Sequence, residues 1–199
     1  MMKNIRSKIV PIPRKDIDTD LIISAEFLTV TDKKGLGEHV FERLRVSDPD
    51  FPLNFEKYKG AEILVARSNF GCGSSREHAA WALFDYGIKV VIAPSFSDIF
   101  YSNAMKNGIL PLILEEKTVE EIFEDEAMNS GEYVVSVDLP NQIIELADGQ
   151  KYEFKIDPYR KECLIKGMDD MDYLLENIAE INKFDKKHKN FIFFDTKNL

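Results

Sequence analysis

The middle third of the chain alternates short apolar runs with segments of helical composition, and this alternation restricts the fold more than any other feature. The apolar runs at residues 61–66, 90–93 and 109–114 are short enough to be buried strands and far too short to span a bilayer. Helices are predicted between them at 77–86 and 97–106. The order strand, helix, strand, helix, strand predicts an α/β layer with parallel pairing.

The last third of the chain has a different pattern. Thr118 and Glu121 have the spacing of a capping box, which predicts the start of an acidic helix that runs to about residue 128. Three consecutive strands are predicted after it, at 133–139, 142–146 and 151–156.

A further helix is predicted near the C-terminal end, starting at Asp169 or Asp170. Its apolar positions recur at helical spacing and are Met171, Leu174, Leu175, Ile178 and Ile181. We predict one mixed domain over residues 1–199, with a core at about 11–115 and a small β/α elaboration at about 116–199.

Composition excludes several classes of protein. The chain carries 35 acidic and 26 basic side chains, a net charge of −9, which argues against nucleic-acid binding because that depends on clustered Lys and Arg. Its two cysteines, Cys72 and Cys163, lie 91 residues apart, so neither a disulfide framework nor a four-cysteine metal site is predicted. The N-terminus lacks the apolar run of a secretory signal. We therefore expect a soluble, cytoplasmic protein with no membrane segment.

The most chemically dense segment, NFGCGSSREH at residues 69–78, joins a predicted strand to a predicted helix. Open α/β sheets bind ligands at such positions, and the free N–H groups of a helix start attract anions. Gly71 and Gly73 permit a tight turn and close approach of the backbone to a ligand. Arg76 adds a planar cation suited to a carboxylate. The segment therefore predicts a site for a carboxylate or a phosphate.

Other interpretations of this loop compete with an anion site. Ser74 and Glu77 also have capping-box spacing, so Ser74 could serve only to cap the helix. Ser74 and His78 are four residues apart, as a hydrolase pair on one helix face would be, although a histidine there is more often structural. A dinucleotide fingerprint is weak because Arg76 stands where the third glycine belongs. Cys72 is interpreted as a small packing residue rather than a reactive thiol.

An acidic cluster near the N-terminus suggests calcium binding and does not meet its requirements. Asp16, Asp18 and Asp20 alternate as in a calcium loop, but Leu21 stands where glycine is needed and Phe27 where glutamate is needed. We predict no metal site in this chain. Spacing alone thus supports an anion-binding α/β domain.

The central loop and its flanks also form a long and specific pattern. The stretch NFGCGSSREHAAWAL, followed by DYGIKVVIAPSFSDIFYSNAMKNGILPLIL, resembles the small subunit of 3-isopropylmalate dehydratase. The segments DIDTDLIISAEFL and LIKGMDDMDYLLENIAEI extend the resemblance over about residues 11–184. It implies the swivelling β/β/α fold of the aconitase C-terminal domain, with a mixed sheet flanked by helices. It also implies a heterodimer in which a large subunit carries a four-iron, four-sulfur cluster, with no cofactor bound by this chain alone.

The activity implied by the resemblance is a hydro-lyase reaction of leucine biosynthesis, in which 2-isopropylmalate becomes 3-isopropylmalate by dehydration and rehydration. Ser74 matches the family serine that acts as general base, and Asp20 matches an aspartate that supports the active site. Ser75 and Arg76 match groups that bind a substrate carboxylate, with the Gly73 backbone beside them. A serine acts as a base only if its alkoxide is stabilised, which the loop N–H groups, the helix dipole and Arg76 can do.

One position departs from the family pattern, in the polar loop at residues 29–37. The superfamily reads the variable group of the substrate there, and aconitase uses an arginine, whereas this chain has Lys33 and Lys34. Lysine does not reproduce the bidentate contact of arginine. Lys33 is therefore interpreted as a residue of the specificity loop, whereas by composition alone it is a solvated loop charge. Related activities on citraconate or 2-methylmalate, 2,3-dimethylmalate or homoaconitate therefore stay open beside isopropylmalate.

Two hypotheses from other functional classes compete with this one. The first is a non-enzymatic module that senses an organic acid or binds RNA, and the net charge argues against RNA. The second is a free-standing hydrolase that uses Ser74 and His78. Labelling of the isolated chain by a serine-directed covalent probe would favour the hydrolase.

Overall fold

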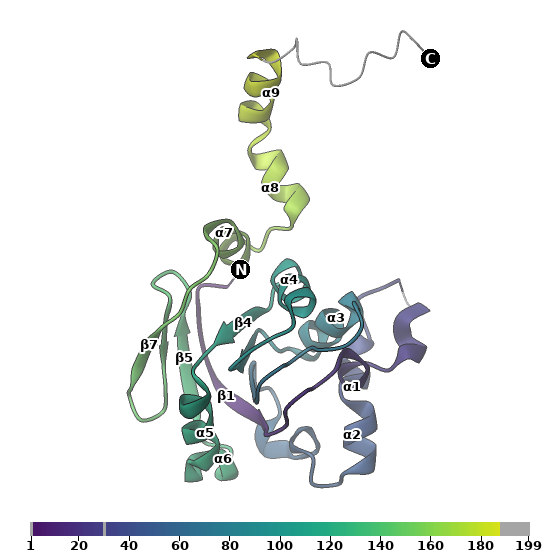
Figure 1. The fold of residues 1–199 in the computed structure, drawn as a ribbon, viewed down its shortest axis with the longest axis vertical. Helices are drawn as coiled ribbons and strands as arrows, with labels where there is room; N and C mark the ends of the chain where they lie inside the picture. The colour runs from purple at the N-terminus through teal and green to yellow at the C-terminus, as the bar shows by residue number, and fades with distance from the viewer. Residues whose placement is uncertain (1, 30, 188–199) are drawn as a thin grey trace.

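A single mixed sheet organises the fold in the computed structural model, which describes residues 2–29 and 31–187 (Figure 1). In that part of the chain the sheet has seven strands in the order β4-β3-β2-β1-β5-β6-β7. Strands β1 to β4 pair in parallel, and β5 to β7 continue antiparallel from the other edge of β1. The strands are β1 (Asn4–Ile12), β2 (Ile63–Ala66), β3 (Val90–Ala93), β4 (Leu110–Ile113), β5 (Val134–Asp138), β6 (Ile143–Glu145) and β7 (Lys151–Glu153).

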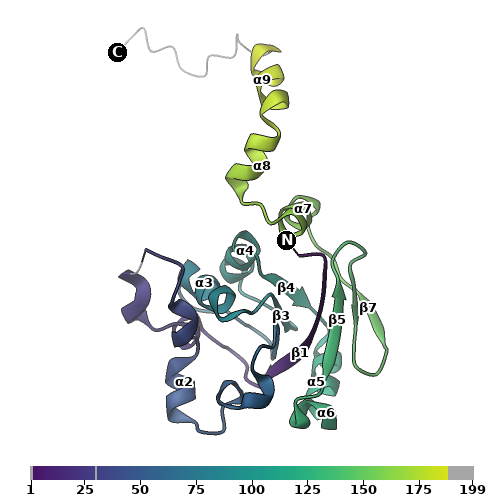
Figure 2. The same ribbon diagram turned by 180° about the vertical axis from the view of Figure 1, so that it is seen from behind.

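Helices cover both faces of this sheet (Figures 1 and 2). They are α1 (Thr19–Ile22), α2 (Glu42–Ser47), α3 (Glu77–Tyr86), α4 (Asp98–Lys106), α5 (Glu116–Glu124), α6 (Glu126–Ser130), α7 (Pro158–Lys166), α8 (Asp170–Glu176) and α9 (Ile178–Lys187). Short 3-10 helices lie at Ala25–Thr29, Leu36–His39, Pro52–Asn54 and Glu56–Tyr58. Among the described residues, no helix combines the length and apolar character needed to cross a membrane.

The predicted α/β fold with its parallel layer is confirmed, and the apolar strands explain why. In β2, Leu64 and Ala66 point into a core that α1, α2 and α3 cover, whereas Ile63 and Val65 point into a second core beneath α5, α6 and α7. The same alternation divides β3 between the two cores. A parallel strand buried on both faces has to be apolar at every position, which is what its sequence shows.

The central strand, β1, was not predicted from the sequence, and neither were the helices α1, α2 and α7. Its exposed side chains Asn4, Arg6 and Lys8 alternate with buried ones, and Pro11 argues against a central strand. Pro11 nevertheless lies near the end of β1, opposite Val65 of β2. β1 therefore joins the parallel half of the sheet to the antiparallel half, whose three strands were predicted near their observed bounds.

The predicted start of the acidic helix is wrong. α5 begins at Glu116, so Thr118 lies inside its first turn, where its side chain is buried instead of capping the helix. The helix also ends at Glu124. Asp125 then caps the separate helix α6, because its side chain accepts a hydrogen bond from the Ala127 N–H at 2.8 Å.

The predicted C-terminal helix is confirmed in its start and differs in its packing. Asp169 and Asp172 form a reciprocal capping box at the start of α8. The helix ends at Glu176, and α9 follows directly after Asn177. Both views show α8 and α9 projecting away from the body of the protein beyond α7 (Figures 1 and 2). The apolar positions of these helices are therefore exposed rather than part of a core.

Candidate active site

The predicted anion-binding loop leads from the end of β2 to the start of α3, and the segment before α1 holds it in place. The N–H of Gly71 donates to the carbonyl of Ile17 at 2.7 Å, and the N–H of Thr19 donates to the carbonyl of Cys72 at 3.0 Å. Asp18 and Cys72 form an isolated parallel bridge. The loop is therefore fixed by main-chain hydrogen bonds to a segment more than 50 residues earlier in the sequence.

Gly71 occupies a position that no other residue fits. Its φ of +73° lies in the left-handed region, and a Cβ added there would lie 2.2 Å from Cγ of Phe100. The Ser97 hydroxyl donates a hydrogen bond of 2.6 Å to the Gly71 carbonyl. Phe100, at the start of α4, thus packs directly against the loop at Gly71.

Replacing Gly71 with alanine is expected to lower the free energy of unfolding by about 2–4 kcal/mol, because overpacking against Phe100 adds to the cost of a left-handed backbone. Gly60→Ala is a matched control, since Gly60 has a φ of +75° and open space around its Cα. The control is expected to cost only about 1–2 kcal/mol. Urea unfolding of both variants measures the difference, and equal losses would show that the contact with Phe100 is unimportant.

The capping alternative for Ser74 is wrong. The N-cap of α3 is Arg76, whose side chain makes no capping hydrogen bond, and Ser74 lies two residues before it. The Ser74 side chain is exposed, while its carbonyl accepts a hydrogen bond of 3.0 Å from the Thr19 hydroxyl. The backbone is therefore held while the hydroxyl of Ser74 faces solvent.

The main chain of the same loop offers several hydrogen-bond donors. Within residues 2–29 and 31–187, the N–H groups of residues 73–77 have no hydrogen-bond acceptor. Gly73 has a φ of +86°, in the left-handed region, so the backbone turns sharply here. Free N–H groups at the start of a helix, next to Ser74 and Arg76, form a favourable environment for an anion.

Arg76 is held in position by Asp20. Its guanidinium donates a hydrogen bond of 2.5 Å to Oδ1 of Asp20, and its side chain is only 17% exposed. Arg43 of α2 donates to the other oxygen of the same carboxylate. The hydrogen bond from Arg76 lowers the pKa of Asp20 below its ordinary 3.8, with Arg43 adding to the effect and burial opposing it. Asp20 is thus ionised at neutral pH and orients two arginines.

Asp20→Asn is expected to lower the free energy of unfolding by about 1 kcal/mol at pH 7, because the substitution removes the charge that both arginines contact. Since the pKa of Asp20 is lowered on folding, its contribution is present above the unfolded-state pKa and is lost as pH falls through the folded-state value. The difference from wild type should therefore shrink below about pH 4. Glu56→Gln, in an exposed ion pair with Lys59, is the control and should change stability little. A difference that does not vary with pH would contradict this role for Asp20.

Lys33 lies apart from this cluster. Its Nζ donates to Oδ1 of Asn107 at 2.9 Å and lies 5.2 Å from the centre of the Trp81 ring. Asn107 in turn donates to Oε1 of Glu77 at 2.8 Å. The loop at 29–37 is thereby linked to the first residue of α3, although residue 30 lies outside the described residues. In the described part of the chain, no contact joins Lys33 to Ser74 or Arg76.

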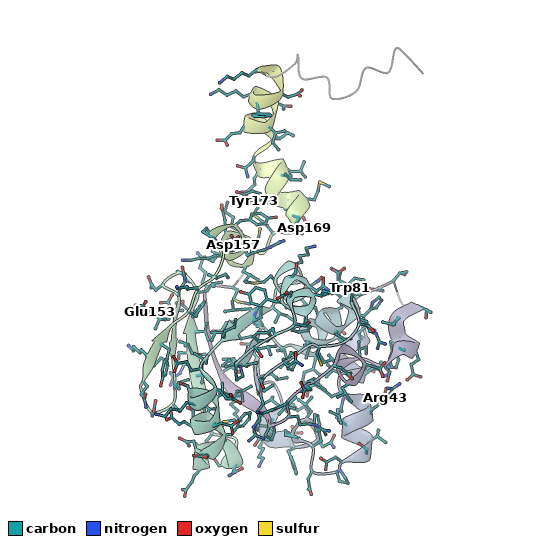
Figure 3. All side chains as sticks on the ribbon, in the orientation of Figure 1. Arg43, Trp81, Glu153, Asp157, Asp169 and Tyr173 are labelled. Atoms are coloured by element: carbon teal, nitrogen blue, oxygen red, sulfur yellow. The ribbon has the colours of Figure 1, made fainter. Side chains whose placement is uncertain are left out.

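The structure thus brings Asp20 together with Gly73, Ser74, Ser75 and Arg76, and Ser75 is exposed beside Ser74. Sequence reasoning missed Arg43 and Asn107. Arg43 is 23 residues from Asp20, in a helix too short to show a periodic pattern, and Asn107 has no motif around it. Figure 3 shows Arg43 and Trp81 on the same side of the molecule, at opposite ends of this region.

The hydrolase pair and a reactive cysteine gain no support. No hydrogen bond joins Ser74 to His78 in the part of the chain that the structure describes, and the His78 ring packs 4.5 Å from that of Trp81. Burial, with smaller contributions from Asp18 and Asp16, raises the pKa of the Cys72 thiol. Among the described residues, no group of three or more His, Cys, Asp or Glu side chains could hold a metal ion. An iron–sulfur cluster needs three or four such ligands, so the donors described here do not fit one.

A mixed sheet, parallel on one side of β1 and antiparallel on the other, with helices on both faces, is an α/β fold. The family model described as Aconitase C-terminal domain matches residues 1–117, and a second, described as LeuD_N, matches residues 120–158. The chain belongs to the family of 3-isopropylmalate dehydratase small subunits, within the aconitase superfamily.

Curated and solved relatives agree with this assignment. The 3-isopropylmalate dehydratase small subunit of Francisella tularensis subsp. novicida is 49% identical over 187 residues, which cover 94% of this chain and 97% of that one. The small subunit from Saccharophagus degradans is 45% identical over 189 residues, covering 88% of this chain and 87% of that one. The crystal structure of 3-isopropylmalate dehydratase from Methanocaldococcus jannaschii matches with a TM-score of 0.69 and 30% identity, covering 90% of this chain and 98% of that one. The predicted family and fold are therefore confirmed.

Proposed function

We propose that this chain is the small subunit of a heteromeric hydro-lyase that isomerises 2-isopropylmalate to 3-isopropylmalate in leucine biosynthesis, in the cytoplasm. The observation that carries the proposal is the arrangement of Ser74 and Arg76. An exposed hydroxyl follows a left-handed glycine turn, lies among free N–H groups, and is next to an arginine that Asp20 holds in position. The names of relatives at 45–49% identity support the substrate.

Ser74 acts as the general base in this proposal. Its oxygen, in the alkoxide form, takes the proton from the substrate carbon, the electron pair of that C–H bond forms the double bond, and the hydroxyl on the neighbouring carbon leaves with its bonding electrons as hydroxide. In rehydration, hydroxide adds to the carbon that lost its proton, and Ser74 returns the proton to the other carbon of the double bond, which regenerates the alkoxide. The N–H groups of residues 73–77 and the charge of Arg76 stabilise the alkoxide. A four-iron, four-sulfur cluster on the large subunit would supply a Lewis acid for the departing hydroxyl.

Arg76, Ser75 and the Gly73 N–H bind a substrate carboxylate. Asp20 occupies one side of the Arg76 guanidinium, which leaves its remaining N–H groups for a ligand. Asp20 also neutralises part of the positive charge of Arg76. The Arg76 guanidinium, which is largely shielded from solvent, is therefore not left without a counter-charge. Binding of a dianion by a chain of net charge −9 then depends on local donors rather than on the overall field.

The proposal is tested by co-expressing the chain with a candidate large subunit under anaerobic conditions and assaying 2-isopropylmalate, citraconate, 2,3-dimethylmalate and homoaconitate. We expect the highest kcat/KM with 2-isopropylmalate and no turnover by the isolated small subunit. Preference for another of these acids would reassign the substrate and would point to the loop that carries Lys33. Turnover by the isolated chain would contradict the proposal.

A further inference from the structure

A line of apolar side chains is exposed along α8 and α9, which together we call the C-terminal arm. These residues are between 40% and 62% exposed and are Met171, Leu174, Leu175, Ile178 and Ile181. We call them the apolar face of the arm. Hydrogen bonds from Asn177 N–H to Tyr173 and from Ile181 N–H to Asn177 continue across the junction of the two helices, so the face is carried on a nearly continuous helical segment. Patches of this kind on a monomer commonly mark interaction surfaces.

Polar contacts at the base of the arm fix it to α7. Arg160 pairs with Asp170 at 2.7 Å, and Lys166 pairs with Glu176 at 2.6 Å. The rings of Tyr159 of α7 and Tyr173 of α8 meet edge to face, and Figure 3 labels Tyr173 at this junction. These contacts use the polar and aromatic side chains of α8. The projecting position of the arm is therefore built into the fold, and it leaves the apolar face exposed.

A cleft lies between the base of the arm and α3, the helix that follows the candidate site loop. It has a volume of about 620 Å³, and its lining includes Lys33, Trp81, Phe84, Asn107, Met168 and Asp169. Met168 and Asp169 directly precede the arm. Asn107 binds Glu77, the neighbour of Arg76 in the sequence. The cleft therefore adjoins the base of the arm at Met168 and Asp169, and Asn107 links it to the first residue of α3.

The size of the apolar face helps to identify its occupant. Five half-exposed side chains offer on the order of 400 Å² of apolar surface, whereas a stable complex needs about 800 Å² per partner. Two copies of this chain that met only through their arms would fall short of that area. A partner that also covers the cleft and the site would reach it. The match to the Francisella small subunit covers 94% of this chain. The residues outside the match are fewer than the residues of the arm, so the match includes at least part of the arm.

We propose that the apolar face of the C-terminal arm binds an apolar groove on the large subunit and anchors the two subunits together. This inference rests on the proposed function, because it takes the large subunit as the partner. The arm contributes to the affinity between the two subunits and lies away from the reacting groups. The contacts of the loop at residues 73–76 therefore do not have to hold the two subunits together.

The test compares two double variants of the full chain. Leu175→Asn with Ile178→Asn changes the apolar face, and Glu180→Gln with Lys183→Gln changes exposed polar positions of the same arm. The Kd for the purified, cluster-loaded large subunit is measured by sedimentation velocity under anaerobic conditions. We expect the apolar variant to bind at least 100-fold more weakly and the control less than threefold more weakly, with equal melting temperatures. Turnover by the apolar variant should recover at saturating subunit concentration.

Three results would overturn the inference. The first is an unchanged Kd for the apolar variant. The second is a melting temperature lowered only in the apolar variant, which would show that the arm packs on its own body. The third is a wild-type chain that dimerises alone and becomes monomeric on substitution, which would make a second copy the occupant. A wild-type complex that forms but converts none of the four acids would instead contradict the proposed function and leave the docking surface in place.

Discussion

Ser74→Ala is expected to reduce kcat at least about 10³-fold while the variant still binds the large subunit with wild-type affinity. The hydroxyl is exposed, and the backbone of Ser74 is held through its own carbonyl, so its removal leaves the loop in place. The loss should fall on kcat with little change in KM, because the proton transfer occurs only in the transition state. Steady-state kinetics of the reconstituted complex measure it.

Ser75→Ala is the matched control for Ser74→Ala. Both hydroxyls are exposed and adjacent, so the two variants remove the same atom from neighbouring positions. We expect the Ser75 variant to raise KM severalfold and to retain most of kcat, in line with a binding role. Equal effects of the two substitutions would mean that Ser74 is not the base. An unchanged kcat for Ser74→Ala would have the same meaning.

Arg76→Lys is expected to lower kcat/KM roughly 10²-fold, since a lost charge-assisted hydrogen bond costs about 1.5–3 kcal/mol. A lysine keeps the charge and loses the planar set of donors that lets Arg76 contact Asp20 and a carboxylate at the same time. The loss should appear mainly in KM. It should also appear as weaker inhibition by dicarboxylates that lack the hydroxyl, measured at constant ionic strength.

Arg43→Lys provides the comparison for Arg76→Lys. Both arginines contact the Asp20 carboxylate, but the Arg43 side chain is 52% exposed and that of Arg76 is 17% exposed. We expect Arg43→Lys to change kcat/KM less than threefold, because exposed ion pairs contribute little. If the two substitutions had equal effects, both arginines would have to be assigned to the substrate.

The features that could be predicted from the sequence are those that depend on residues close together in the chain. Three of the four parallel strands and the two helices between them follow from apolar runs and helical segments of ordinary length, and their bounds were predicted within two residues. Four of the candidate site residues are consecutive in the sequence, so a motif that identifies one of them identifies all four: Gly73, Ser74, Ser75 and Arg76. The resemblance then supplied Asp20, which spacing alone would have left as one of several acids near the N-terminus.

What could not be predicted depends on contacts between distant residues. Asp20 and Arg76 are 56 residues apart, and the hydrogen bond from Lys33 to Asn107 spans 74 residues. Capping-box spacing also indicated the wrong helix start in two places. Thr118 is buried inside α5, and Ser74 lies outside α3. In both cases a local spacing rule gave the wrong residue because tertiary burial or a turn set where the helix begins.

The position of β1 has a consequence for how the protein is made. This first strand pairs with β2 on one edge and with β5 on the other, so one of its neighbours is synthesised early and the other about 130 residues later. On the ribosome, the parallel half can assemble first, but the edge of β1 that pairs with β5 stays unpaired until β5 emerges. We therefore expect truncated chains that end before β5 to aggregate, and the completion of this sheet to be the slow step of folding.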